Sequence, residues 1–141
     1  MFNNSSRYKH TNNLISENYT NINSNNNSQS EFNPFDKNYW GPKTWDILHS
    51  FSYSYPDKPT QQQKLNAFNF YSSIGYLLPC SYCQEHCLDY INKFPPQVDS
   101  KNNLVNWVLT FHNEVNINLG KETWSRIRLD NKYNTDNAFC S

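Results

Sequence analysis

The sequence predicts an all-α fold, a four-helix bundle with a short fifth helix. Four segments place apolar residues three or four positions apart, the spacing of one helix face. Alternation at period two is nowhere sustained, and Val, a good strand former, occurs only four times in 141 residues. Prolines mark the breaks between the periodic segments. Helices joined by short, proline-marked loops are typical of a compact bundle.

The expected helices follow the apolar pattern in chain order. The strongest segment carries apolar residues from Leu104 to Leu119; Ser100 or Asn102 caps its start and Gly120 ends it. The full expectation is a helix through 45–55 that ends at Pro56, one from about Thr60 to the break at Pro79, one over 82–94 that ends at Pro95-Pro96, one over 104–119, and a weaker segment over 124–129.

Composition divides the chain in two, and a short C-terminal tail is expected after the second part. Residues 1–36 contain eleven Asn and only nine apolar residues, whereas residues 37–141 contain 42 of the 51 apolar residues. A segment so poor in apolar side chains cannot offset its ordering entropy, so residues 1–36 are expected to be a disordered tail. Residues 37–135 are expected to form one small domain, and 136–141 a flexible tail that carries Cys140.

Charge and hydropathy exclude several classes of protein. Twelve Lys and Arg balance twelve Asp and Glu without a basic block, which argues against nucleic-acid binding. No apolar run is long enough to span a bilayer, and no basic start followed by an apolar stretch suggests a signal peptide. We therefore expect a soluble protein without a membrane span.

Three cysteines, Cys80, Cys83 and Cys87, lie within eight residues directly after Pro79. The Cys-x-x-Cys pair fits a redox dithiol, because helix N-terminal amides favour the thiolate that exchanges disulfides. It also fits half of a zinc site completed by Cys87, His86 or Cys140, although no second Cys-x-x-Cys pair follows. Ordinary structural disulfides are the third possibility.

Two helical histidines suggest a ligand. Trp45, His49 and Tyr53 are spaced four apart and share one face, as do His112 and Asn116. A lone helical His is more often a packing residue, but rings, amides and imidazoles together suit a flat heteroaromatic ligand held between helices.

These motifs, taken in order, resemble the Erv/ALR family of flavin-linked sulfhydryl oxidases. The resemblance runs from about residue 38 to 133. It depends on these strings: Trp40-Gly41-Pro42-Lys43-Thr44-Trp45 followed by His49, then Tyr55-Pro56, then Pro79-Cys80-Ser81-Tyr82-Cys83, then His112-Asn113-Glu114-Val115-Asn116-Ile117-Asn118-Leu119-Gly120-Lys121.

The resemblance implies that FAD is held non-covalently at the mouth of the bundle and that no metal is bound. Its first helix would contribute Gly41, Pro42, Lys43, Thr44, Trp45, His49 and Tyr53. Its fourth would contribute His112, Asn113, Val115, Asn116 and Asn118. Lys121 would reach the phosphates, and Lys132 and Tyr133 would cover the adenine end.

The resemblance also implies the reaction. Cys80 would be the interchange sulfur attacked by a protein dithiol, either a thioredoxin-like or a Cys-x-x-Cys client, and Cys83 the sulfur beside the flavin. Electrons would pass through FAD to oxygen and give hydrogen peroxide. A homodimer is implied as well. The chain departs from the family in having no Cys between Cys87 and Cys140, so a structural disulfide found in relatives is absent from its usual place.

Two questions stay open from sequence. Cys87 could be a buried apolar residue, could pair with Cys140, or could trap the active disulfide in a wrong pairing. Cys140 could be a shuttle thiol, could form an inter-subunit or structural disulfide, or could be a free thiol. The compartment is expected to be a viral factory, virion or host cytoplasm, because no signal peptide is evident and the Asn-rich start is a poor mitochondrial presequence; the mitochondrial intermembrane space is the alternative.

Overall fold

The structure is a computed structural model that describes residues 32–134. Within these residues it contains five α-helices, one 3₁₀ helix and no strand, which confirms the predicted all-α fold. The predictions for residues 1–31 and for the tail with Cys140 lie outside the described residues. The elements are α2 (Lys37–Ser54), α3 (Gln61–Ser73), the 3₁₀ helix η2 (Ile74–Leu77), α4 (Ser81–Lys93), α5 (Lys101–Asn118) and α6 (Arg126–Tyr133).

Each α-helix starts at a side chain that accepts a backbone N–H. Asp36 caps α2, Ser100 caps α5 as predicted, and Ser125 caps α6. Thr60 forms a reciprocal capping box with Gln63 at the start of α3. Proline follows α2 and α4 closely, and Gly120 follows α5 with a φ of 65°, the left-handed conformation that glycine adopts most readily.

Three of the predicted helix boundaries are wrong. The helix expected over 45–55 begins eight residues earlier, at Lys37, because Asp36 caps it there. The helix expected to reach Pro79 ends at Ser73 and continues as η2, because Gly75 lies directly against α4: a Cβ there would stand 2.9 Å from Leu88 Cδ2 and 3.1 Å from Cys87 Sγ. The segment expected over 124–129 instead forms α6, which starts at Arg126 because the backbone of Trp124 is bonded to Asn113.

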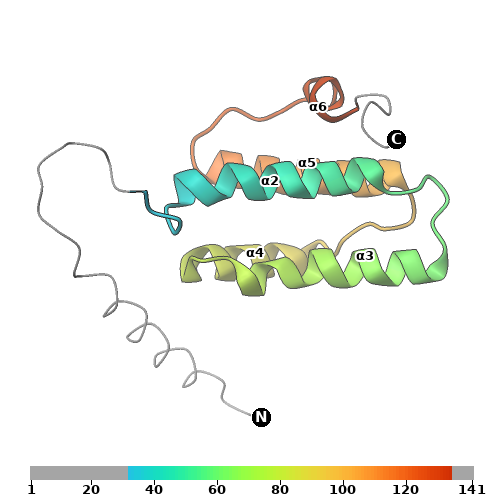
Figure 1. Cartoon of the computed structure of the whole chain (residues 1–141), viewed down its shortest axis with the longest axis horizontal. Coiled ribbons are helices and arrows are strands. Elements are labelled where there is room, and N and C mark those ends of the chain that lie inside the picture. Colours follow the sequence, from blue (N-terminus) through green and yellow to red (C-terminus); the bar gives the residue numbers. More distant parts are fainter. Residues whose placement is uncertain (1–31, 135–141) are drawn as a thin grey trace, which may run out of the picture. The chain divides into compact units, whose positions relative to one another are not determined.

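The helices pack as a bundle around an aromatic core. Helices α2 and α5 lie side by side, α6 contacts both, and η2 contacts α3 and α4 (Figure 1). Tyr71 of α3 donates its hydroxyl to the carbonyl of Leu48 at 2.8 Å, and its ring meets Trp107 edge-on. Tyr90 of α4 stacks on Phe111 of α5. These ring contacts tie α3 and α4 to the α2–α5 pair.

A smaller apolar cluster attaches α6. Val105, Leu109 and Leu129 are buried together, with Tyr53, Trp124 and Tyr133 packed around them. No helix between residues 32 and 134 combines the length and apolarity needed to cross a bilayer.

Candidate functional site

A cavity of about 510 Å³ lies between α2, α4 and α5 and extends to the segment that includes α6. A volume of this size is typical of sites for cofactors and drug-sized ligands. Thirteen of the residues predicted to be functional line it: Gly41, Pro42, Thr44, Trp45, Cys80, Cys83, His112, Val115, Asn116, Asn118, Lys121, Lys132 and Tyr133.

The cavity wall contains a disulfide between Cys80 and Cys83, whose Cα atoms are 5.2 Å apart. Cys80 is the N-cap of α4, and its sulfur accepts the backbone N–H of Cys83 at 3.2 Å. A sulfur held at the N-terminus of a helix is well placed to become a thiolate when the disulfide opens.

Aromatic rings form another part of the wall. The indole of Trp45 stacks on the imidazole of His112, with centroids 4.3 Å apart and planes 10° from parallel. Phe111 meets the same indole edge-on, and Trp124 lies 5.6 Å from His112. The result is a flat, largely apolar surface of the kind against which a planar ring system packs.

Behind this surface, His49 and His112 form a buried hydrogen bond, with His49 Nε2 and His112 Nδ1 2.9 Å apart. Burial lowers the pKa of His49 to about 3 and that of His112 to about 4, so both imidazoles are neutral at pH 7. His49 Nδ1 has no hydrogen-bond partner among the described residues, although His49 is fully buried.

Helix α6 is held to α2 by a polar cluster around Asp46. Lys132 Nζ lies 2.7 Å from Asp46 Oδ1, and the Tyr133 hydroxyl donates to the same oxygen. These two hydrogen bonds lower the pKa of the Asp46 carboxyl. Because Lys132 and Tyr133 both line the cavity, Asp46 fixes the cationic and aromatic groups of that part of the wall.

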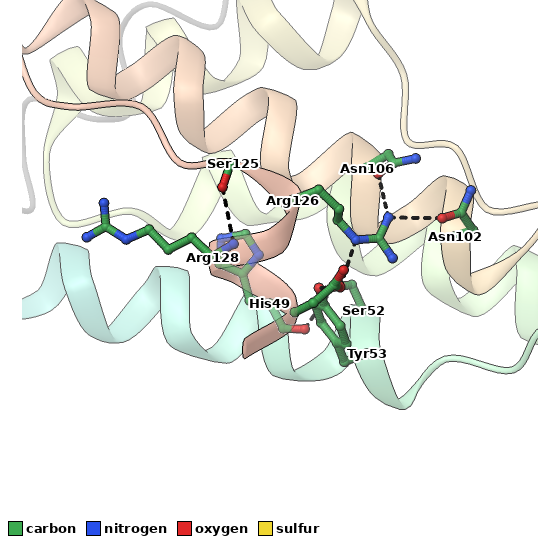
Figure 2. Close-up of polar contacts among 9 residues, drawn as sticks. His49, Ser52, Tyr53, Asn102, Asn106, Ser125, Arg126 and Arg128 are labelled. Atoms are coloured by element: carbon green, nitrogen blue, oxygen red, sulfur yellow. Dashed lines mark hydrogen bonds and ion pairs between the residues drawn. The ribbon is translucent and has the colours of Figure 1, made fainter. Parts of the chain in front are cut away.

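A second cluster, around Arg126, attaches the start of α6 to α5 and α2 (Figure 2). The guanidinium donates to Asn102 at 2.9 Å, to Asn106 at 2.7 Å and to Asp130 at 2.8 Å. The Tyr53 hydroxyl donates to the same Asp130 oxygen at 2.5 Å, and burial is the main cause that raises the Tyr53 pKa to about 12.

Four residues predicted to touch the cofactor are not among those lining the cavity. Lys43 lies over the Tyr39 ring, His49 lies behind His112, and Tyr53 is bonded to Asp130. Asn113 accepts the N–H of Trp124 and donates to its carbonyl, each at 2.8 Å. Asn113 therefore positions Trp124, which does line the cavity.

Several cavity residues were not predicted from sequence. Trp40 lies inside the Trp-Gly-Pro motif, and Tyr82 and His86 lie on one face of α4 with Cys83, so spacing alone could have indicated them. Asp46 and Trp124 carried no local signal, because their partners are on other elements: Lys132 and Tyr133 of α6 bond Asp46, and Asn113 of α5 bonds Trp124. The additional lining residues are Lys37, Asn38, Trp40, Asp46, Leu48, Ile74, Leu78, Tyr82, His86, Cys87, Phe111, Leu119 and Trp124.

The structure gives the zinc alternative no support. Cys80 and Cys83 are joined to each other, and between residues 32 and 134 no group of three or more His, Cys, Asp or Glu is placed to hold a metal ion. Cys87 is a buried free thiol, and burial raises its pKa to about 11. It therefore resembles an inert packing residue more than a thiolate ligand.

Comparisons with known proteins point to one family. Residues 42–134 match the model of the Erv1 / Alr family. A probable FAD-linked sulfhydryl oxidase of Acanthamoeba polyphaga mimivirus is 37% identical over 86 residues, which cover 59% of this chain and 60% of the relative. The mitochondrial FAD-linked sulfhydryl oxidase of Saccharomyces cerevisiae is 38% identical over 88 residues, covering 62% and 47%. The matched region thus spans less than two thirds of either relative.

Solved structures agree with the sequence comparisons. The crystal structure of the yeast Erv1 core superposes with a TM-score of 0.69 at 30% identity, covering 77% of this chain and 92% of that one. The FAD-binding domain of Erv1 from Saccharomyces cerevisiae gives 0.67 at 33% identity, covering 70% and 93%. Since the family model covers well over half of the chain and its motifs lie around one cavity, the chain belongs to the Erv1/Alr family.

Proposed function

We propose that the protein is an FAD-dependent sulfhydryl oxidase that makes disulfides in protein thiol substrates and gives the electrons to oxygen. The observation that carries this proposal is the Cys80–Cys83 disulfide in the wall of an aromatic cavity of cofactor size. The relatives named FAD-linked sulfhydryl oxidases in mimivirus, yeast and African swine fever virus support it.

The groups around the cavity fit the chemistry of FAD. Trp45 and His112 offer a flat stacked pair, which suits a planar heteroaromatic ring. Lys121 and Lys132 supply positive charge for a pyrophosphate, and Asn116 and Asn118 supply amides for polar edges. We assign cofactor contacts to the predicted residues that line the cavity, and a supporting role to Lys43, His49, Tyr53 and Asn113.

The two cysteines have different roles in the proposed reaction. A client thiolate attacks Cys80, the Cys80–Cys83 bond breaks, and Cys83 leaves as the thiolate. A second client thiolate then attacks the client sulfur of this mixed disulfide, which forms the client disulfide and releases Cys80 as a thiolate. The pair is left reduced by two electrons. Bound FAD supplies a two-electron acceptor that can be reoxidised by oxygen to give hydrogen peroxide.

The client is proposed to be a dithiol protein of the thioredoxin-like or Cys-x-x-Cys type. Cys80 is only half-buried and Tyr82 beside it is exposed, so an extended client segment can approach the disulfide. For location we propose the cytoplasm or virions of an infected cell, supported by the viral relatives. The yeast relative is named mitochondrial and supports the alternative compartment.

We further propose that two copies associate through one apolar face, defined as Ile47 and Phe51 of α2 with Phe70 of α3. Ile47 is 49% exposed, Phe51 51% and Phe70 40%, and the last two rings are in contact at 5.5 Å. A contiguous face of large exposed apolar residues is typical of a protein–protein interface.

A visible absorption spectrum tests the proposed oxidase. The purified protein should show a band near about 450 nm that bleaches on anaerobic addition of dithiothreitol and returns in air. A folded protein without this band would contradict the proposal, and so would a flavin band that does not respond to the dithiol.

A further inference from the structure

Gln84, the residue after Cys83, holds the chain leading into the disulfide at two places. Its backbone N–H donates to the Cys80 carbonyl at 2.9 Å, one of the first hydrogen bonds of α4. Its side-chain Nε2 donates to the carbonyl of Leu78 at 2.7 Å. Pro79, which lies between the two acceptors, has a fixed φ. The peptide group before Pro79 and the one after Cys80 are therefore both bonded to one residue.

The acceptor of the side-chain bond is itself fixed. Leu78 follows η2 in an extended conformation, with φ −64° and ψ 135°, and its side chain packs against the main core cluster. Gln84 is half-buried, which shields the bond from competing water. The segment 78–80 thus connects to the core through Leu78 and to α4 through Gln84.

This arrangement matters most when the disulfide is open. In the oxidised pair the S–S bond already holds Cys80 near Cys83, so the Gln84 bond adds little restraint. In the dithiol that covalent restraint is lost, and the Gln84–Leu78 bond keeps the Cys80 sulfur close to the N-terminus of α4. A pair held in closing geometry has a high effective concentration, which favours the disulfide.

We propose that Gln84 is a positioning residue that preorganises the Cys80–Cys83 dithiol for closure and so makes the disulfide harder to reduce. The inference rests on the proposed function only in taking this pair as the redox centre. Its effect is on the exchange equilibrium itself: two glutathione thiols reduce the Cys80–Cys83 disulfide to the dithiol and become one glutathione disulfide, with two electrons transferred.

The test measures that equilibrium directly. The full-length holoprotein is equilibrated anaerobically in glutathione buffers of graded ratio and quenched by alkylation, and the Cys80–Cys83 peptide is quantified by mass spectrometry. Gln84→Met keeps the length of the side chain and removes the donor. The equilibrium constant for reduction of the disulfide by glutathione should rise about fivefold in this variant. The amount of glutathione adduct trapped on Cys80 should rise as well.

Gln97→Met is the matched control, because Gln97 Nε2 donates to the carbonyl of Pro95 at 3.1 Å on an exposed loop after α4. It should leave the equilibrium unchanged. If Gln84→Met does not fold, Gln84→Ala should show the same shift. An equilibrium unchanged by loss of the Gln84 donor overturns the inference, as does an equal shift in the Gln97 variant. A colourless protein that still shows the specific shift would reject the oxidase and leave the role of Gln84 standing.

Discussion

The Cys80 sulfur accepts the N–H of Cys83 at 3.2 Å, so the more N-terminal sulfur lies where α4 presents its unbonded amides. Cys83 lies one turn before the buried Cys87 and shares its side of the helix. Both cysteines line the cavity and both are half-buried, and we propose that Cys80 meets the client while Cys83 is the sulfur next to the cofactor. The assignment can be tested by removing one sulfur.

Cys83→Ser is expected to abolish thiol-dependent oxygen consumption and leave FAD bound, because the disulfide cannot form while the aromatic wall is unchanged. An oxygen electrode with a dithiol substrate measures turnover, and the visible spectrum measures bound flavin. Ser81→Ala, an exposed residue between the two cysteines, is the control and should keep turnover. Turnover in the Cys83 variant would refute the assignment.

The His49–His112 pair makes stability depend on pH. Burial lowers the pKa of His49 from 6.5 to about 3 and that of His112 from 6.5 to about 4, whereas both histidines titrate normally in the unfolded chain. Below about pH 6.5 the unfolded chain therefore binds protons that the folded protein does not. The contribution of this pair to the free energy of unfolding is therefore largest above pH 6.5, and it decreases as the pH falls toward 4.

Urea unfolding at fixed FAD concentration should show this loss of free energy between pH 6.5 and 4, at most about 1.4 kcal/mol per pH unit for each imidazole. His49→Asn keeps an amide near His112 but does not titrate, so it should reduce the slope by about half. An unfolding free energy that stays constant across this pH range would contradict the buried neutral pair.

At the scale of elements, α6 is the part of the bundle whose place is least determined by its own sequence. It is eight residues long and buries only Leu129, so it depends on polar attachments at both ends. At the C-terminal end of α6, Lys132 and Tyr133 donate hydrogen bonds to Asp46 of α2. At the N-terminal end, Arg126 donates to Asn102 of α5. The Asp46 pair is more exposed than the Arg126–Asp130 pair, and Arg126 makes three hydrogen bonds, so we expect the Arg126 cluster to contribute more.

Arg126→Ala should increase hydrogen exchange at the α6 amides, because three acceptors lose their donor; a local cost of about 1 kcal/mol corresponds to roughly fivefold faster exchange. Arg126→Lys should not restore protection, since an ammonium cannot reproduce the fork of a guanidinium. Ile127→Ala, at a position 74% exposed, is the control. Equal protection in the Arg126→Ala and control variants would show that the apolar cluster alone holds α6.

At the scale of the whole molecule, the face formed by Ile47, Phe51 and Phe70 lies on α2, which also lines the cavity, and on α3, which does not. Helix α2 contributes Trp45 to the cavity and Ile47 and Phe51 to this face, so association of two copies would stiffen the helix that lines the site.

Ile47→Glu should convert the proposed dimer to a monomer in sedimentation velocity, because a carboxylate buried in an apolar interface has no partner. Ile127→Glu, a similar change at an exposed site on α6, should leave the sedimentation coefficient unchanged. A wild-type chain that sediments as a monomer at micromolar concentration would reject the interface.

The sequence by itself determined the helical fold, the helix starts or breaks at Thr60, Ser100 and Gly120, and half of the cavity wall. Apolar residues at a spacing of 3.6 form a helix face through neighbours in the sequence. The helix signals at Thr60, Ser100 and Gly120 likewise involve residues only a few positions away, so the local sequence is sufficient to predict them. The motifs around Trp45, Cys80 and His112 were recognisable because each is a short string on one helix.

Only the tertiary structure decided which of these residues face the cavity. His49 and Asn113 lie in the recognised motifs, yet one is bonded behind His112 and the other holds Trp124. Lys132 and Tyr133 reach the wall because α6 returns to α2, where both bond Asp46 more than eighty residues away in sequence, and Trp124 is placed by its two bonds to Asn113. Contacts of that range depend on packing and long-range hydrogen bonds, which periodicity and local spacing do not encode.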